Sequence, residues 1–178
     1  MGTDLDREVG YILMKKILFQ GDSITDCGRN RADNESVGAG YACYVKAQLG
    51  YENPTEYQFF NRGIGGNKIV DMYARIKSDM INLEPDYISF LIGVNDVWHE
   101  IGREPGRENG VRADFFEQIY NILIAELKAA LPELRIIIME PFVLEGTGTT
   151  EHWDEFKTEV TLRALAAKRV AEKNGLEF

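Results

Sequence analysis

The feature that most constrains the fold is the alternation of short apolar runs with longer segments of helical period. Four runs fit buried strands, and they cover residues 17–19, 57–61, 87–92 and 135–140. Apolar side chains on both faces of a strand, without polar alternation, are typical of a sheet covered on both sides. The sequence therefore predicts an α/β domain of three layers, with a parallel sheet between two layers of helices.

Between and after these runs, apolar residues recur at spacings of three and four. The pattern predicts helices at residues 41–49, 69–80, 114–131 and 154–170, and Asp114 and Glu117 are expected to form a capping box for the third. Gly50 and Gly175 are expected to end the first and the last of them. Residues 102–110 are polar and contain glycine and proline, so we expect a surface loop there. Residues 176–178 look like the start of a fifth strand.

The composition bounds the kind of protein. The chain has 178 residues, 44% of them apolar, and we expect a single domain at residues 14–178. Residues 1–13 precede a natural start at Met14 and are expected to be a leader or extension. A formal net charge of −9 disfavours nucleic acids and anionic membranes as partners. No signal peptide or membrane span is visible, so we expect a cytoplasmic protein and leave a homo-oligomer open.

Polar clusters follow the first three strands, at residues 20–26, 61–67 and 93–96. Because the carboxyl ends of parallel strands lie along one edge of a sheet, we expect the clusters to meet there. Ser23 is the candidate nucleophile, and the oxyanion that its attack creates needs N–H donors. We expect these donors to be the backbone of Ser23, the backbone of Gly66 and the side-chain amide of Asn95. The predicted chemistry is that of a serine esterase.

Other interpretations of the same clusters fail on spacing. No glycine stands two residues after Ser23, which excludes the nucleophile turn of the α/β-hydrolases. Residues 63–68 lack the third glycine of a dinucleotide-binding loop and do not match a P-loop. Asp22, Asp26 and Asp96 are candidates for a glycosidase carboxylate pair only through their position. The two cysteines have no metal-ligand spacing, and the sequence predicts neither a metal nor a cofactor.

A more specific expectation comes from the motifs taken in order. They are residues 21–29 (GDSITDCGR), the pair Gly66-Asn67, residues 92–98 (IGVNDVW) and Pro141-Phe142. From about residue 17 to residue 142 the chain resembles the SGNH or GDSL hydrolase family, most of all its bacterial acetylxylan-esterase-type, lysophospholipase L1-like members. The resemblance implies a flavodoxin-like fold, no metal, Ser23 as nucleophile and Gly66 and Asn95 in the oxyanion hole. It implies a small-molecule or oligosaccharide acyl ester as substrate, with acetyl groups removed from sugar hydroxyls.

The family completes its site with an Asp-x-x-His block near the C-terminus, ahead of the last helix, and these 178 residues contain no such block there. Their one Asp-x-x-His sequence, Asp96-Val97-Trp98-His99, follows the third strand instead. We therefore expect a C-terminally incomplete domain that lacks the base together with the last strand and helix. His99 is a weak substitute for the base, and His152 is expected to lie on a loop. Two alternatives stay open, a non-catalytic carbohydrate- or acyl-binding module and a lipase- or thioesterase-type member. Leaving-group recognition is expected from residues 29–39 and 102–110.

Overall fold

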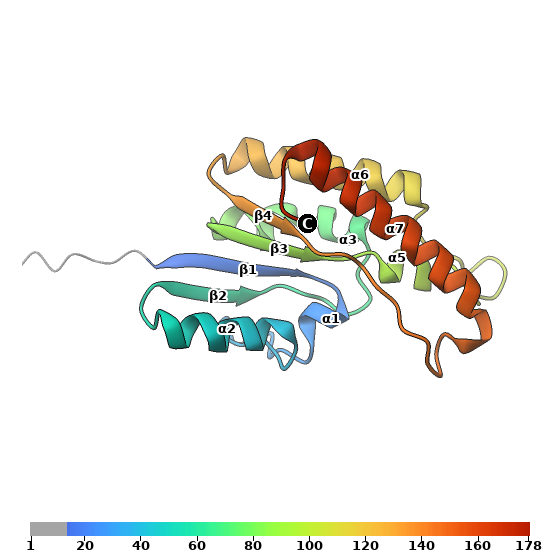
Figure 1. Ribbon diagram of the computed structural model, residues 1–178, viewed down its shortest axis with the longest axis horizontal. Coiled ribbons are helices and arrows are strands. Elements are labelled where there is room, and N and C mark those ends of the chain that lie inside the picture. The colour runs from blue at the N-terminus through green and yellow to red at the C-terminus, as the bar shows by residue number, and fades with distance from the viewer. Residues whose placement is uncertain (1–13) are drawn as a thin grey trace, which may run out of the picture.

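The computed structural model describes residues 14–178, so the expected leader at residues 1–13 lies outside the described part of the chain. One parallel sheet has the strand order β2-β1-β3-β4 (Figure 1). Its strands are β1 (Lys15–Gly21), β2 (Tyr57–Asn61), β3 (Tyr87–Leu91) and β4 (Arg135–Ile138). All four predicted strands are confirmed, with ends that differ by two residues or fewer. Glu177 forms a single parallel bridge with Ile137, which agrees with the expected start of a fifth strand.

Helices cover both faces of the sheet, which confirms the three-layer prediction. Figure 1 shows α2 on one side and α3, α6 and α7 on the other. The helices are α1 (Ser23–Asp26), α2 (Tyr41–Glu52), α3 (Ile69–Ala74), α4 (Ile76–Asp79), α5 (Val94–Trp98), α6 (Ala113–Ala130) and α7 (Trp153–Asn174), with 3₁₀ turns η1 (Ile81–Leu83) and η2 (Thr150–His152). Within residues 14–178, no helix combines the length and the apolarity that a membrane crossing requires.

The two faces of the sheet carry cores of different size. Leu18 of β1 belongs to the larger core, where β3 and β4 pack against α3, α6 and α7. Its neighbour Phe19 points to the other face, where it joins Phe59 and Ala42 in a smaller core under α2. Successive residues of a strand point to opposite faces, so a strand that is buried twice needs apolar residues in sequence. This explains why β1 reads as a continuous apolar run.

Three predictions about the helices are wrong in detail. The segment 69–80 is divided into α3 and α4 at Arg75, which turns the chain and donates hydrogen bonds toward the sheet edge. Gly50 lies inside α2, which continues to Glu52. The expected capping box of α6 does not form, because Asp114 pairs with the side chain of Arg112 at 3.0 Å instead. Gly175 ends α7 in a left-handed conformation, as expected.

Candidate active site

Ser23 is the first residue of α1, directly after β1 ends at Gly21. The preceding residue, Asp22, is buried and caps the helix, because its Oδ1 accepts a hydrogen bond from the backbone N–H of Ile24 at 2.9 Å. Ser23 itself is exposed, and within residues 14–178 its backbone N–H has no acceptor. Free N–H groups are expected in the first turn of a helix. Ser23 therefore presents a hydroxyl and a free N–H at the carboxyl edge of the sheet.

Residues 63–69, here called the glycine loop, lead from β2 into α3. Six of their seven backbone N–H groups have acceptors: Gly63 bonds Asn61 Oδ1 (2.8 Å), Ile64 bonds Gly21 O (3.1 Å), Gly65 bonds Asp26 Oδ2 (3.4 Å), Asn67 bonds Ile64 O (3.1 Å), Lys68 bonds Asp71 Oδ2 (2.9 Å) and Ile69 bonds Asp96 Oδ1 (3.1 Å). The seventh, that of Gly66, has no acceptor in the described part of the chain. Gly66 has a φ of 83°, in the left-handed region that favours glycine. Its free N–H is a donor available to a bound ligand.

The glycine loop passes directly against the nucleophile segment. A Cβ added at Gly63 would lie 2.4 Å from the backbone nitrogen of Asp26, so only glycine allows this approach. A Cβ added at Gly65 would lie 3.6 Å from the Cβ of Ser23. Gly65 therefore lies close to Ser23, and the free N–H is that of the next residue, Gly66.

Helix α5 holds the glycine loop from the opposite side. Asn95 donates one hydrogen bond from Nδ2 to the carbonyl oxygen of Asn67 at 3.2 Å, and within residues 14–178 its second amide hydrogen has no acceptor. The buried carboxylate of Asp96 accepts the N–H of Ile69, which begins α3. The structure therefore brings together the three predicted oxyanion elements, Ser23, Gly66 and Asn95, at one edge of the sheet.

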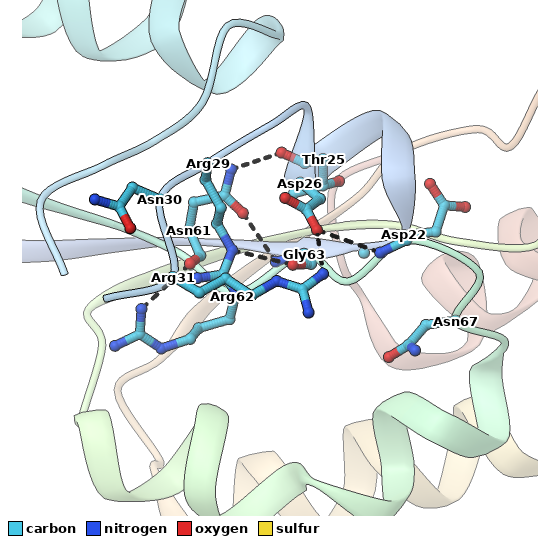
Figure 2. A network of polar contacts seen from close by, with 12 residues as sticks. Asp22, Thr25, Asp26, Arg29, Asn30, Arg31, Asn61, Arg62, Gly63 and Asn67 are labelled. Atoms are coloured by element: carbon cyan, nitrogen blue, oxygen red, sulfur yellow. Dashed lines mark hydrogen bonds and ion pairs between the residues drawn. The ribbon is translucent and has the colours of Figure 1, made fainter. Parts of the chain in front are cut away.

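Arginine side chains also bond the same loop, and Figure 2 shows Arg29 beside Gly63. Arg29 donates from Nε to the carbonyl oxygen of Gly63 at 3.1 Å. Arg75 donates from Nε to Oδ1 of Asn67 at 3.0 Å, and its NH2 group also reaches Gln20. The charge-assisted bonds of guanidinium groups are stronger than neutral ones and have a fixed geometry. Arg29 therefore holds the loop backbone near its first residue, and Arg75 holds the side chain of Asn67 nearer its end.

Asp26 links this arginine group to the loop. Its Oδ2 accepts from Arg31 at 2.7 Å and from the N–H of Gly65 at 3.4 Å (Figure 2). Burial acts to raise the pKa of Asp26, but the hydrogen bonds from Arg31 and Gly65 and the charges of Arg31 and Arg29 outweigh it and leave the pKa below its usual value. Asp26 is therefore ionised when it binds the loop.

A cavity of about 590 Å³ opens beside the nucleophile. Ser23 and Asn95 line it, and its remaining walls are largely apolar: Ile24, Val94, Trp98, Phe142, Val143, Leu144, Gly146, Thr147, Gly148 and Thr149. Residues 142–149, between β4 and α7, supply most of this wall. The loops at residues 29–39 and 102–110 do not line this cavity, and their expected part in recognising the leaving group stays a prediction.

Two buried aspartates beside the site have raised pKa values. Burial raises the pKa of Asp96 to about 7, although the N–H of Ile69 and the charge of Arg163 act in the opposite direction. Burial likewise raises the pKa of Asp22 to about 6 against the hydrogen bond from Ile24. Each carboxyl group accepts a backbone N–H at the site, that of Ile24 for Asp22 and that of Ile69 for Asp96. Each remains protonated to a higher pH in the folded state than in the unfolded chain.

The raised pKa of Asp96 predicts a pH dependence of stability. Between about pH 4 and pH 7 the unfolded chain loses the Asp96 proton while the folded state keeps it, so the contribution of this group to stability falls as the pH rises. In Asp96→Asn the amide oxygen still accepts from Ile69, and this fall should disappear. Urea denaturation at pH steps from 4 to 8 measures it, with the exposed Asp154→Asn as control. Parallel curves for the wild type and Asp96→Asn would contradict the assignment.

The two histidines occupy different places. His99 lies at the end of α5, and its Nε2 is 3.1 Å from the carbonyl oxygen of Gly66. His152 was expected on a loop, but it ends the 3₁₀ turn η2 directly before α7, where its Nδ1 lies 3.8 Å from Oε2 of Glu155. Within residues 14–178, neither forms a hydrogen bond with Ser23. No group of three His, Cys, Asp or Glu side chains in this part of the chain is arranged to hold a metal ion.

Sequence reasoning missed the residues that support the site. Arg75 contacts the glycine loop, and residues 143–149 line most of the cavity wall, yet neither stands in a recognisable motif. His99 was predicted only as a weak substitute for the base, and its contact with the loop was not expected. The sequence did contain a signal for Asp96. It directly follows Asn95, and an acidic residue beside a polar cluster is a candidate for a buried hydrogen-bond acceptor of the neighbouring loop.

Known proteins are similar to this chain in sequence and in fold. Residues 19–178 match the GDSL-like lipase/acylhydrolase family. An acetylxylan esterase of Geobacillus stearothermophilus is 35% identical over 169 residues, which cover 92% of this chain and 74% of the relative. The crystal structure of an acetylxylan esterase from that organism superposes with a TM-score of 0.80 at 35% identity and covers 91% of this chain and 74% of the other. Catalytic mutants of that esterase have alanine in place of a serine, an aspartate or a histidine.

A putative GDSL-like lipase from Parabacteroides merdae superposes with a TM-score of 0.82 at 32% identity and covers 93% of this chain and 78% of the other. The family match and the structural match both cover nearly the whole described chain. The chain belongs to the GDSL-like lipase/acylhydrolase family, and its general activity is ester hydrolysis.

Proposed function

We propose that the protein hydrolyses small acyl esters with Ser23 as the nucleophile. Ser23 Oγ attacks the ester carbonyl carbon, and its proton passes to a base. The tetrahedral intermediate then expels the alcohol, which takes up that proton, and water hydrolyses the acyl-enzyme that remains. The N–H groups of Ser23 and Gly66 and the amide of Asn95 hold the oxyanion. The observation that carries the proposal is the free N–H of Gly66, the only unpaired one in the glycine loop as far as the structure describes the chain, beside Ser23.

The base is proposed by analogy. In the Geobacillus stearothermophilus esterase the mutated catalytic aspartate and histidine are three residues apart. A histidine from such a pair would accept the Ser23 proton and return it to the leaving alcohol. We assign this role to no residue of the segment 14–178, because neither of its histidines bonds Ser23.

The proposed substrate is an acetyl ester on a carbohydrate. Support comes from the acetylxylan esterase relative and from the cavity of about 590 Å³ beside Ser23, which would receive the sugar and the acetyl group. A chain with a net charge of −9 also favours a neutral oligosaccharide over an anionic ligand.

The experiment uses the product of the complete open reading frame. We expect release of acetate from acetylated xylooligosaccharides, and kcat/KM for nitrophenyl esters should fall about 10-fold or more from acetate to octanoate as the acyl chain outgrows the site. Equal or higher activity on octanoate would favour the lipase- or thioesterase-type alternative. Acetate release is measured by an enzyme-coupled assay, and nitrophenol release by absorbance.

A second candidate is a non-catalytic module that binds acylated carbohydrate. One observation favours it, namely that no histidine within residues 14–178 contacts Ser23. A fluorophosphonate probe distinguishes the two candidates, because it labels only an activated serine. Labelling of Ser23, located by peptide mapping, supports the esterase. Binding of acetylated xylooligosaccharide by calorimetry without labelling or acetate release supports the module.

A further inference from the structure

We propose that His99 is a positioning residue that holds the Gly66 carbonyl, on one side of the Gly66 Cα, and so restricts the Gly66 N–H on the other side to the direction of the ester oxygen. This inference rests on the proposed function. It assigns to His99 a role in the oxyanion hole rather than the role of base that its position in an Asp-x-x-His sequence suggested.

The geometry begins with the spacing of α5. Asn95 and His99 are four residues apart and lie on the same face of the helix. They bond two consecutive carbonyl groups of the glycine loop: Asn95 donates to the oxygen of Asn67 at 3.2 Å, and His99 Nε2 lies 3.1 Å from the oxygen of Gly66. One helix face therefore fixes two neighbouring peptides of the loop.

The backbone at Gly66 needs such a contact. The loop is held before this point by Asp26 at Gly65 and after it by Asn95 at Asn67. Between them the only side chain that bonds Gly66, within the described chain, is His99. Glycine rotates freely at φ and ψ, and Gly66 has glycine as its preceding neighbour. The Gly66 carbonyl lies in the peptide between Gly66 and Asn67, which His99 and the Asn67–Ile64 bond hold, and the Gly66 N–H lies in the preceding peptide. Without the imidazole, the Gly66 backbone is held on this side by one bond fewer, and the N–H of the preceding peptide has more freedom of direction.

The same contact argues against His99 as the base. A carbonyl oxygen can only accept, so Nε2 of His99 carries the hydrogen and donates it to Gly66. A general base has to present an unprotonated nitrogen to the serine hydroxyl. His99 is itself held in place, because its backbone N–H bonds Asn95 and its carbonyl oxygen accepts from Asn109 at 2.8 Å. Its Nε2 is therefore committed to the loop.

Three variants of His99 test the proposal in the product of the complete reading frame. His99→Phe keeps a ring without a donor, His99→Asn has a donor on a shorter arm, and His99→Gln places a donor at nearly the reach of Nε2. Loss of a whole oxyanion donor costs about 10²- to 10³-fold in kcat, so a misdirected one should cost about 10-fold. We expect this fall in kcat for His99→Phe and His99→Asn, with KM nearly unchanged, and near-normal kcat for His99→Gln.

Each other outcome overturns the proposal in a distinct way. Wild-type kcat in both His99→Phe and His99→Asn would show that the contact does not serve catalysis. Loss of the acylation burst in His99→Gln, as complete as in a variant without Ser23, would make His99 the base. The matched control His152→Phe should behave as wild type, and thermal denaturation confirms that each variant is folded. If the Ser23 variant itself stays active, the proposed function fails, whatever His99 does.

Discussion

Replacement of Ser23 by alanine is expected to lower kcat for a nitrophenyl acetate ester by a factor on the order of 10⁴ or more. The side chain is exposed at the start of α1, and its removal eliminates the only group proposed to form the acyl-enzyme. The fold should not suffer, because the Ser23 side chain forms no hydrogen bond within residues 14–178. The measurement is the pre-steady-state burst together with the steady-state rate.

Ser78→Ala is the matched control. Ser78 is an exposed serine in α4 whose hydroxyl bonds the backbone of its own helical turn, and we expect unchanged kinetics. A Ser23→Ala protein that keeps the burst and the turnover of the wild type would mean that another group attacks the ester, and the mechanism would have to be abandoned.

Replacement of Asn95 by alanine is expected to reduce kcat by about 10²- to 10³-fold with little change in KM. The reason is that the Asn95 amide is proposed to donate to charge that develops only in the transition state. Asn95→Asp should be at least as damaging, because a carboxylate cannot donate and repels an oxyanion. Steady-state kinetics on acetate esters separates kcat from KM for both variants.

Asn95 also bonds Asn67, so part of the loss reflects the loop. Comparison with His99→Phe, which removes only the contact to the Gly66 carbonyl oxygen, separates the two contributions. Asn82→Ala in η1, an exposed asparagine that precedes β3 at the opposite end of that strand, serves as control and should match the wild type. If KM rises and kcat stays constant, Asn95 binds the substrate without stabilising the transition state.

The strands were predictable because burial on both faces leaves a strong local signal. In β1, Leu18 and Phe19 enter opposite cores, so the sequence shows an unbroken apolar run whatever the rest of the chain does. The division of the segment 69–80 was not predictable. Its apolar spacing continues through α3 and α4, and the break at Arg75 depends on Gln20 and Asn67, which only the folded sheet brings within reach.

The same distinction holds for the site. Ser23, Gly66 and Asn95 could be grouped in advance, because the strand ends of a parallel sheet meet at one edge. The groups that hold them could not. Whether Asp96 bonds Ile69, or His99 bonds Gly66, depends on how closely α5 approaches a loop about 30 residues earlier in the chain, and no local pattern encodes that distance.

The wall of the cavity has a consequence for how such an enzyme can diverge. Residues 142–149 are stabilised mainly from within: Thr149 Oγ1 accepts from the N–H of Gly146 and donates to the oxygen of Leu144, and Thr150 bonds Gly146. No hydrogen bond joins this segment to the glycine loop in the described chain. Under the proposed mechanism, mutations there would alter which alcohol or acyl group fits while the proposed oxyanion donors stay in place. Substrate choice and catalysis would therefore depend on different segments of the chain, and evolution could change the substrate without changing the catalytic residues.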